Sequence, residues 1–523
     1  MSGSPASSGQ RLFNIASEYI DAPADRFGGA TAYVCDDQRV SYAELQFEVG
    51  RVGNALRALG VEMEQRVALL LPNIPEFVTS FFGAARIGAV AAPMSTAVPA
   101  DEQIFLLADS RAQVLIAHAA LWAPLRARRG ELPFLRHVLL IDGPPGEEGE
   151  RQFEDVVLAA SPDCPVAPTT EDDVAFWLHT SGSTGTPKWA MHAHRDMPYA
   201  EREYARPIVG LGSDDVVLAG GPCFHAYPLG LTTYFALAAG ASVVLHRERS
   251  TPARIAELIS RHRVTVFAGV PTLYALLLAA LDGGLQGDLS SVRLCLSAAE
   301  PLPAELLRRW RARFGIEILD GIGTTEALHV FMSNRQGDVR DGSSGRALPG
   351  YEIRLVDDGG ASVGTGEIGN LVISGGSVFI GYWNRIDTSR RTLQGSWYFT
   401  GDKYSRDADG YFWYHGRADD MLRVSGHWVS PTEVEGALMT HPAVLEAAVV
   451  GQADGDELIK PKAFVILRAD APTPTEALAT ELKDHVKATI APYNYPRWIE
   501  FVTELPKTAT GKIQRYKLRE AAP

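Results

Sequence analysis

The stretch AFWLHTSGSTGTPK, residues 175–188, decides how the rest of the chain is interpreted. Its first five residues have the character of a buried strand, and the remainder is a loop rich in glycine and hydroxyl groups that ends in Lys188. Glycines let a backbone approach phosphate closely, hydroxyls and amides donate hydrogen bonds, and lysine supplies positive charge. The Walker A spacing is absent, and Pro187 lacks the amide with which such a loop would begin its helix. We therefore predict a phosphate-binding loop of another type, the alternative being an ordinary polar surface loop.

Helices alternate with short apolar strands through much of residues 50–320, which favours an α/β fold with parallel sheets covered on both faces. Two of these strands are expected at residues 264–270 and 316–323. Ligands in such folds bind beyond the carboxyl ends of the strands, so the loop from Gly321 to Glu326 is expected to line a site.

Two smaller regions follow. Short strands punctuated by glycine and aspartate between residues 351 and 415 predict a small antiparallel sheet or barrel. Beyond Arg417, the segment Ser430–Glu433 has the pattern of a capping box with proline at the first helical position, so a helix should begin there. The last hundred or so residues therefore predict a separate α+β domain.

The composition bounds the function. A chain of 523 residues exceeds the roughly 250–300 residues of a single core, so at least two domains are expected. The net charge of −14 disfavours a nucleic-acid partner, and any phosphate must be held by a few local groups. The four cysteines are scattered without CxxC spacing, which predicts buried thiols in a reducing compartment. Without a signal peptide or a run near ~20 apolar residues, a cytoplasmic protein with no membrane partner is expected.

Five motifs occur in a fixed order: Thr180–Lys188, Gly323–Glu326, Tyr398–Asp402, Gly416–Asp420 and Pro506–Lys512. Together they resemble the signatures of the acyl-adenylate-forming, AMP-binding superfamily, and most closely those of benzoate-CoA and other aryl-CoA ligases. The resemblance implies an α/β fold with a large N-terminal domain of two doubly wound sheets and a β-barrel-like subdomain, followed by a small mobile α+β domain. It implies boundaries at residues 1–416 and 420–523, with a hinge at residues 417–419.

The resemblance also implies a reaction. A carboxylate attacks the α-phosphate of ATP, pyrophosphate leaves, and CoA then forms the thioester and releases AMP. Both reactants of the first step are anions, so catalysis must come from positioning and from positive charge aimed at the phosphorus. The implied catalytic residues are Lys512, Glu326 as the Mg²⁺ ligand, Thr325 at the α-phosphate, and His225, a position that shifts between half-reactions in many relatives.

The nucleotide-binding residues implied by the same motifs form a larger set. They are Thr180, Ser181, Gly182, Ser183, Thr184, Gly185, Lys188, Ala299, Glu300, Asp320, Gly321, Ile322, Thr325, Asp402, Arg417 and Lys512. Asp402 and Arg417 are expected to contact the ribose. Asp419 is the implied pivot of the hinge, and Ser425 and Gly426 are implied on the approach of CoA.

By the match to benzoate-CoA ligases, Ala226, Tyr227, Gly323, His329 and Val330 would surround an aromatic ring. Such a pocket suits a flat, mainly apolar ring with one polar substituent. The alternatives are that Tyr227 is a core aromatic and that His329 is an ordinary buried histidine.

Two positions depart from the superfamily pattern, because Trp189 replaces a usual glycine and Ile322 replaces a usual aromatic residue. Three other functions therefore stay open: transfer of the aryl group to a carrier-protein pantetheine, diazotisation of an aromatic amine with nitrite, and adenylate binding without catalysis. The residues distinguish neither the ring substituent nor a monomer from a homodimer.

Overall fold

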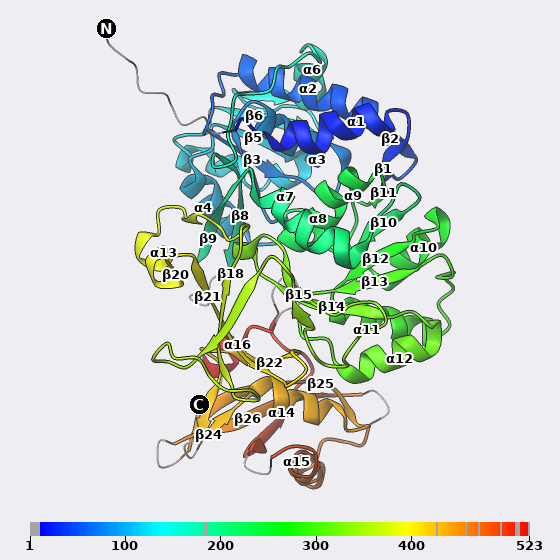
Figure 1. Cartoon of the computed structure of the whole chain (residues 1–523), viewed down its shortest axis with the longest axis vertical. Coiled ribbons are helices and arrows are strands. Elements are labelled where there is room, and N and C mark those ends of the chain that lie inside the picture. The colour runs from blue at the N-terminus through cyan, green and yellow to red at the C-terminus, as the bar shows by residue number, and fades with distance from the viewer. Residues whose placement is uncertain are drawn as a thin grey trace.

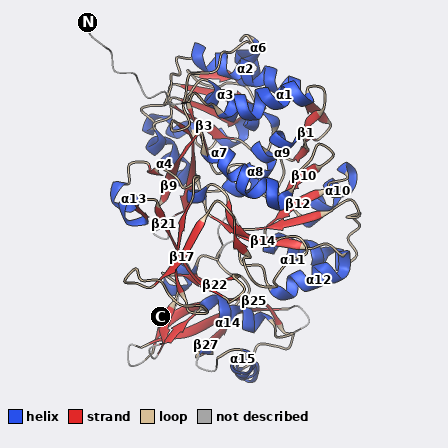
Figure 2. Cartoon of the chain, viewed as in Figure 1, coloured by secondary structure: helices blue, strands red, loops and turns tan. Residues whose placement is uncertain are grey.

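The computed structural model describes residues 11–181, 186–424, 427–454, 458–468, 471–491, 494–507 and 513–520. Two large sheets and their helices form the upper part of the molecule in Figure 1, and the C-terminal residues form a smaller lobe beneath them. The predicted α/β architecture is confirmed, and Figure 2 shows helices on both sides of the large sheets.

The first large sheet carries the predicted phosphate loop. Its strands, in order across the sheet, are β19 (Gly381–Tyr382), β9 (Pro187–Ala193), β8 (Val174–Ser181), β4 (Val90–Pro93), β3 (Arg66–Leu70), β5 (Val114–His118), β6 (His137–Ile141) and β7 (Glu150–Gln152). The strands from β8 to β7 pair in parallel, whereas β8 and β9 form an antiparallel hairpin and β19 pairs antiparallel with β9. The residues after the loop therefore form a strand, not a helix, because Pro187 begins β9 and the next helix starts at Asp196.

The second large sheet has nine strands. Their order is β16 (Arg346–Ala347), β15 (Val330–Ser333), β14 (Ile318–Gly323), β13 (Leu294–Ser297), β12 (Val266–Gly269), β10 (Val216–Ala219), β11 (Ser242–Leu245), β1 (Thr31–Cys35) and β2 (Gln38–Ser41). The strands β14 to β1 pair in parallel, so the carboxyl ends of β13 and β14 lie at one edge, as predicted.

Successive side chains of one strand point to opposite faces of the sheet and so pack in two different hydrophobic cores. Val243 of β11 packs in a central core shared by both large sheets, whereas its neighbour Val244 packs in an outer core. The central core holds α2 (Tyr42–Ala58), α3 (Pro75–Arg86), α8 (Ala226–Thr232) and α9 (Tyr234–Ala239). The outer core holds α10 (Pro252–His262), α11 (Pro271–Asp282) and α12 (Ala304–Phe314), and α4 (Ala100–Ser110) covers the far face of the first sheet. The two sheets thus share one layer of helices.

A five-stranded antiparallel sheet follows, as predicted for this region. It contains β17 (Glu352–Val356), β18 (Gly369–Ser374), β20 (Leu393–Gln394), β21 (Trp397–Arg406) and β22 (Phe412–Arg417), with α13 (Ile386–Thr392) before β20. This sheet ends at the start of the predicted hinge.

The C-terminal residues build a core of their own. Their elements are β23 (Leu422–Val424), β24 (His427–Val429), α14 (Pro431–Met439), β25 (Val444–Ala453), β26 (Ile459–Leu467), α15 (Glu476–Thr489), β27 (Trp498–Phe501) and α16 (Arg515–Glu520). The predicted helix start is present, because the Ser430 hydroxyl accepts from the Glu433 amide at 3.1 Å. The Glu433 carboxylate, however, accepts from Asn494 at 3.1 Å instead of closing a reciprocal capping box.

All four cysteines are buried and free, as predicted. Within the described ranges, no helix is long and apolar enough to cross a membrane.

Candidate active site

The phosphate motif forms the connection of the β8–β9 hairpin. Thr180 pairs with Lys188 and Ser181 with Pro187 across the two strands, so the motif begins and ends side by side. Four predicted nucleotide-binding positions, Gly182, Ser183, Thr184 and Gly185, lie outside the described residues. The described part of the motif therefore lies at the ends of the two paired strands, with Lys188 opposite Thr180.

Lys188 and Glu326 meet through Tyr382. The Lys188 ammonium lies 5.1 Å from the centre of the Tyr382 ring, and the Tyr382 hydroxyl donates to Oε1 of Glu326 at 2.6 Å. Burial lowers the pKa of Lys188, and the nearby Glu326 carboxylate opposes that shift. Charged groups of both signs are therefore held close together at a partly desolvated site.

Glu326 sits in a short helical turn, Thr325–Ala327, whose backbone is tied to neighbouring segments. The Thr324 hydroxyl accepts from the Ala327 amide at 3.1 Å, and the Glu326 carbonyl accepts from the Phe379 amide at 2.7 Å. The Ala327 carbonyl accepts from the Ser377 hydroxyl at 2.8 Å. These bonds fix the direction of the Glu326 side chain, which is only 7% exposed.

The carboxylate of Glu326 fits a magnesium ion, because hard cations prefer oxygen ligands. Among the described residues no group of three or more His, Cys, Asp or Glu side chains could hold a metal. An ion at Glu326 would therefore take its other oxygens from phosphate and water, as Mg²⁺ commonly does.

Asp402 and Arg417, which were both expected to contact the ribose, pair with each other. They face each other across β21 and β22, and Nη1 of Arg417 lies 3.0 Å from Oδ1 of Asp402. The same guanidinium nitrogen donates to the Thr400 carbonyl at 3.1 Å. The Asp402 carboxylate raises the pKa of Arg417 further, so the guanidinium stays charged.

The remaining predicted nucleotide residues lie at the ends of β13 and β14. Ala299 has a left-handed backbone with φ of 77°, and one Glu300 oxygen accepts from the Thr272 hydroxyl at 2.8 Å. Asp320 is buried and accepts from the Ser297 hydroxyl at 2.8 Å, and burial raises its pKa. Its side chain thus ties β14 to β13, and Ile322, two residues further along β14, is half-buried. A side chain at Gly321 would lie 2.7 Å from the Met332 carbonyl oxygen, which explains the glycine.

The predicted ring-binding residues come together. Ala226 and Tyr227 open α8, and the Tyr227 ring lies 5.5 Å from the ring of His329. His329 directly precedes Val330, which pairs with Gly323, and a Cβ at Gly323 would lie 2.6 Å from the His329 carbonyl oxygen. The segment around the 323–330 turn therefore faces the start of α8.

His329 is neutral at ordinary pH, because burial lowers its pKa to about 3. Its Nε2 lies 3.1 Å from the Tyr227 carbonyl oxygen, which can only accept, so Nε2 carries the proton. Its Nδ1 and the Tyr227 hydroxyl are buried without a hydrogen-bond partner among the described residues. Such atoms suit a site that closes on a ligand with polar groups.

Trp189 is a core residue and not part of a ligand surface. It is fully buried, and its ring packs edge-on against His179 at 5.7 Å. The His179 ring in turn lies 6.2 Å from that of His225, the N-terminal flanking residue of α8. The Trp189 side chain thus fills space in the core next to the phosphate hairpin. It contacts His179, which in turn contacts His225.

The predicted hinge residue Asp419 is exposed and follows the β22 strand. Asp420, the next residue, pairs with Arg519 and lies 3.7 Å from Arg515, so α16 returns to the hinge. Lys512 lies outside the described residues, but its loop is closed at the base by a bridge between Lys507 and Ile513. Ser425 and Gly426, between β23 and β24, also lie outside the described residues.

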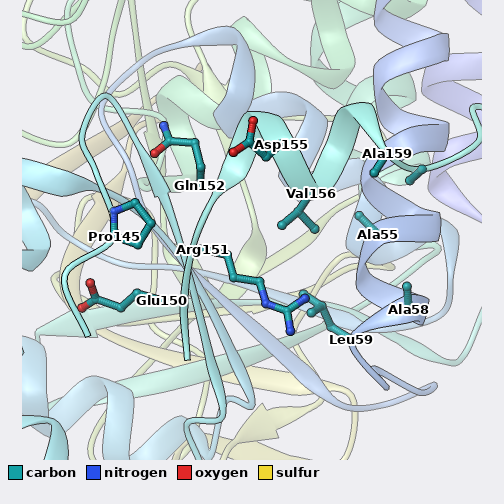
Figure 3. Close-up of a pocket in the computed structure, with 11 residues that line it drawn as sticks. Ala55, Ala58, Leu59, Pro145, Glu150, Arg151, Gln152, Asp155, Val156 and Ala159 are labelled. Carbon is teal, nitrogen blue, oxygen red and sulfur yellow. The ribbon is translucent and has the colours of Figure 1, made fainter. Parts of the chain in front are cut away.

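A surface cleft of about 560 Å³ lies elsewhere, between α2, β7 and α6 (Phe153–Leu158), as Figure 3 shows. Four alanines line it, two in α2 and two directly after α6, and Glu150, one of its two acidic residues, is already paired with Arg126 at 2.8 Å. None of the predicted site residues lines this cleft. It is therefore separate from the candidate active site.

Comparison with known proteins defines the class. The family model for AMP-binding enzyme matches residues 20–383, and that for AMP-binding enzyme C-terminal domain matches residues 433–512. The chain belongs to the AMP-binding enzyme family.

Ligases of aromatic acids are among its relatives. A benzoate–CoA ligase of Thauera aromatica is 47% identical over 94% of this chain and 93% of its own length. A 4-hydroxybenzoate–CoA/benzoate–CoA ligase of Rhodopseudomonas palustris is 42% identical over 98% of this chain and 94% of its own length. The crystal structure of the anthranilate CoA ligase AuaEII with anthranoyl-AMP superposes with a TM-score of 0.92 at 44% identity. The match covers 98% of this chain and 97% of that one.

Sequence reasoning missed three residues that support the site. Tyr382 lies in the mostly apolar run from Val378 to Trp383, where nothing in the sequence distinguishes it from its aromatic and aliphatic neighbours. His192 contacts the Thr325 turn and Asp196 contacts His192, and in the sequence these two gave only the spacing of an i, i+4 pair. That spacing does not indicate that strand residue His192 reaches a turn 133 residues away.

Proposed function

We propose that this protein is an ATP-dependent, AMP-forming aryl-CoA ligase. A carboxylate oxygen of the aromatic acid attacks the α-phosphorus of ATP, the bond to the bridging oxygen breaks, and pyrophosphate leaves. The CoA thiol then loses its proton and attacks the carbonyl carbon of the aryl-adenylate. The bond to the adenylate oxygen breaks, giving the aryl thioester and AMP.

One observation carries the proposal: a charged residue, Glu326, and a residue of the predicted ring pocket, His329, lie three residues apart in the segment after β14. Glu326, joined to Lys188 through Tyr382, is three residues before His329, whose ring packs against Tyr227. An aromatic acid with its ring against the side chains of Tyr227 and His329 would direct its carboxylate toward the Glu326–Lys188 cluster. That orientation supplies the proximity that adenylation needs.

The charges at the site support the first half-reaction. Lys188 is partly buried, so its positive charge acts in a low dielectric, where it stabilises phosphate more strongly than in water. Magnesium, held by Glu326, would neutralise phosphate charge and orient the pyrophosphate. Asp402 would accept hydrogen bonds from the ribose hydroxyls, with Arg417 fixing its carboxylate.

We propose that the C-terminal residues act by rotation about Asp419. In one orientation Lys512 would bridge the substrate carboxylate and the α-phosphate, and in the other Ser425 and Gly426 would border the path of CoA. The anchoring of α16 on Asp420 supports this, because the loop that carries Lys512 would move together with the residue after the pivot.

The test is carboxylate-dependent exchange of pyrophosphate into ATP, with benzoate and its amino-, hydroxy- and halo-derivatives, followed by AMP release with and without CoA. The names of the relatives make benzoate, 4-hydroxybenzoate and anthranilate the first compounds to try. Exchange that CoA does not convert into AMP release would favour a carrier protein or nitrite chemistry. The absence of exchange with every aromatic acid would refute the proposal.

A further inference from the structure

A buried histidine joins the strand of Lys188 to the turn of Glu326. His192 of β9 is fully buried, and its Nε2 lies 2.9 Å from the carbonyl oxygen of Thr325. Its Nδ1 lies 2.8 Å from Oδ2 of Asp196. The imidazole also stacks on the ring of Phe176 in β8, with centres 5.2 Å apart and an angle of 14° between the planes. Both ring nitrogens and one ring face are therefore engaged.

The proton on Nε2 is fixed by its partner. A carbonyl oxygen only accepts hydrogen bonds, so Nε2–H of His192 must donate to Thr325. Asp196 holds this arrangement, because its Oδ2 also accepts from the Ala193 amide at 3.1 Å and is thus locked in place beside Nδ1. Whether the shared proton sits on Nδ1 or on the carboxyl, the donor toward Thr325 is the same.

The contact spans two sheets. His192 belongs to the first sheet, four residues beyond Lys188, whereas Thr325 follows β14 of the second sheet. The other two carbonyls of the turn, on Glu326 and Ala327, are held by Phe379 and Ser377. The bond from His192 is thus the one of these three that ties the turn to the strand that carries Lys188.

We propose that His192, oriented by Asp196, is a positioning residue for adenylation. It sets the distance between the phosphate-binding hairpin and the Thr325–Glu326 turn, so that both contact the same nucleotide. This inference rests on the proposed function, since it assumes that the turn binds the α-phosphate.

Two substitutions of one residue separate positioning from simple packing. His192→Phe keeps a ring to stack on Phe176 but removes the donor from the neighbouring strand, which leaves the Thr325 carbonyl with the Leu328 amide at 3.0 Å as its remaining donor. His192→Gln places an amide N–H near the position of Nε2. His262→Gln, a matched change in α10 of the outer layer, serves as the control.

The binding of AMP is measured by calorimetry without magnesium, and the KM values for Mg·ATP and for the aromatic acid are measured by pyrophosphate exchange. His192→Phe is expected to weaken AMP binding and to raise the KM for Mg·ATP by about 10- to 100-fold, the loss expected for one buried hydrogen bond. The KM for the acid should stay within about twofold, and His192→Gln should recover most of the affinity for AMP.

The inference is overturned if folded His192→Phe binds AMP as the unchanged protein does, or if the Phe and Gln variants lose affinity equally. If the Phe variant does not fold, Asp196→Asn decides, because it keeps the volume and should weaken AMP binding in the same direction. The unchanged protein in the same assays tests the proposed function separately, since a failure of that function removes exchange before any substitution.

Discussion

The Tyr382 hydroxyl lies 2.6 Å from Oε1 of Glu326 and joins two segments that are 56 residues apart in the chain. Tyr382 belongs to β19, which pairs with β9, so the contact to Glu326 comes from the strand beside the one that carries Lys188. The phenol thereby holds one of the two Glu326 carboxylate oxygens in place.

Tyr382→Phe tests this relationship. The ring under the Lys188 ammonium is kept, and only the hydrogen bond to Glu326 is lost. Because hydrogen bonds to charged groups contribute about 1.5–3 kcal/mol, we expect the KM for Mg·ATP to rise about tenfold or more while the KM for the aromatic acid changes little. Tyr516→Phe, on the exposed side of α16, is the control. An unchanged KM for Mg·ATP would contradict the role assigned to the phenol.

Gly230→Ala tests the ring-binding region. A Cβ at Gly230 would lie 2.5 Å from Cδ2 and 2.6 Å from Nε2 of His329, so the imidazole must move. Overpacking of this kind costs about 1–3 kcal/mol, and we expect kcat/KM for the aromatic acid to fall about 10-fold or more. Calorimetry should find AMP binding unchanged, because the Asp402–Arg417 pair is not touched.

Gly436→Ala is the matched control for that substitution. Gly436 lies in α14, and no atom lies within 4 Å of the position of an added Cβ. Replacing glycine by alanine inside a helix reduces the entropy of the unfolded chain, so stability should rise by about 0.5–1 kcal/mol. Thermal unfolding and the two KM values check this, and a loss of stability would show that the helix does not tolerate the methyl group.

Acidification should destabilise the protein through three buried histidines. Burial lowers the pKa of His179 and His194 to about 4 and that of His329 to about 3, from the ordinary value of 6.5. Below pH 6.5 the unfolded chain therefore binds protons that the folded chain does not, so stability falls as the pH decreases toward 4. Each histidine contributes a slope of up to about 1.4 kcal/mol per pH unit.

Denaturant unfolding at pH 7, 6 and 5 measures this slope, and His179→Phe isolates one contribution. His179 packs among the rings of Trp189 and Phe224, so an apolar ring suits its surroundings. The free energy of unfolding of the variant should therefore fall less steeply with decreasing pH, by up to about 1.4 kcal/mol per pH unit. An identical slope in both proteins would mean that His179 is protonated in the folded state.

Asp419→Pro tests the hinge. Proline fixes φ near −65°, so a pivot that must rotate would be held in one orientation. We expect pyrophosphate exchange to stay within about threefold while thioester formation falls at least about tenfold, because only the second step requires the rotation. Asp419→Ala should leave both steps near their original rates. Equal effects of proline on both steps would argue against rotation at this residue.

Much of the fold could be predicted because its signals are local. The strand of residues 316–323 and the turn after it are encoded by apolar alternation followed by glycines, and the structure has β14 at Ile318–Gly323. The helix at Pro431 was encoded by its own first four residues, and the Ser430 cap is present.

Contacts between distant segments could not be predicted in this way. Trp189 was unexplained by its neighbours in sequence, because its partner His179 is set by the register of the β8–β9 hairpin. The support of Glu326 by Tyr382, and of Thr325 by His192, depends on how β19 and β9 pair and on how the two large sheets pack. The positions of Lys512, Ser425 and Gly426 relative to the site stay predictions.

The most direct test of aryl-acid adenylation is the exchange of labelled pyrophosphate into ATP by the full-length protein, with benzoate, 4-hydroxybenzoate or anthranilate present. The account predicts exchange that requires one of these acids and magnesium, and AMP and thioester formation in equal amounts once CoA is added. Exchange that is absent with all aromatic acids, or that proceeds equally well without them, would contradict it.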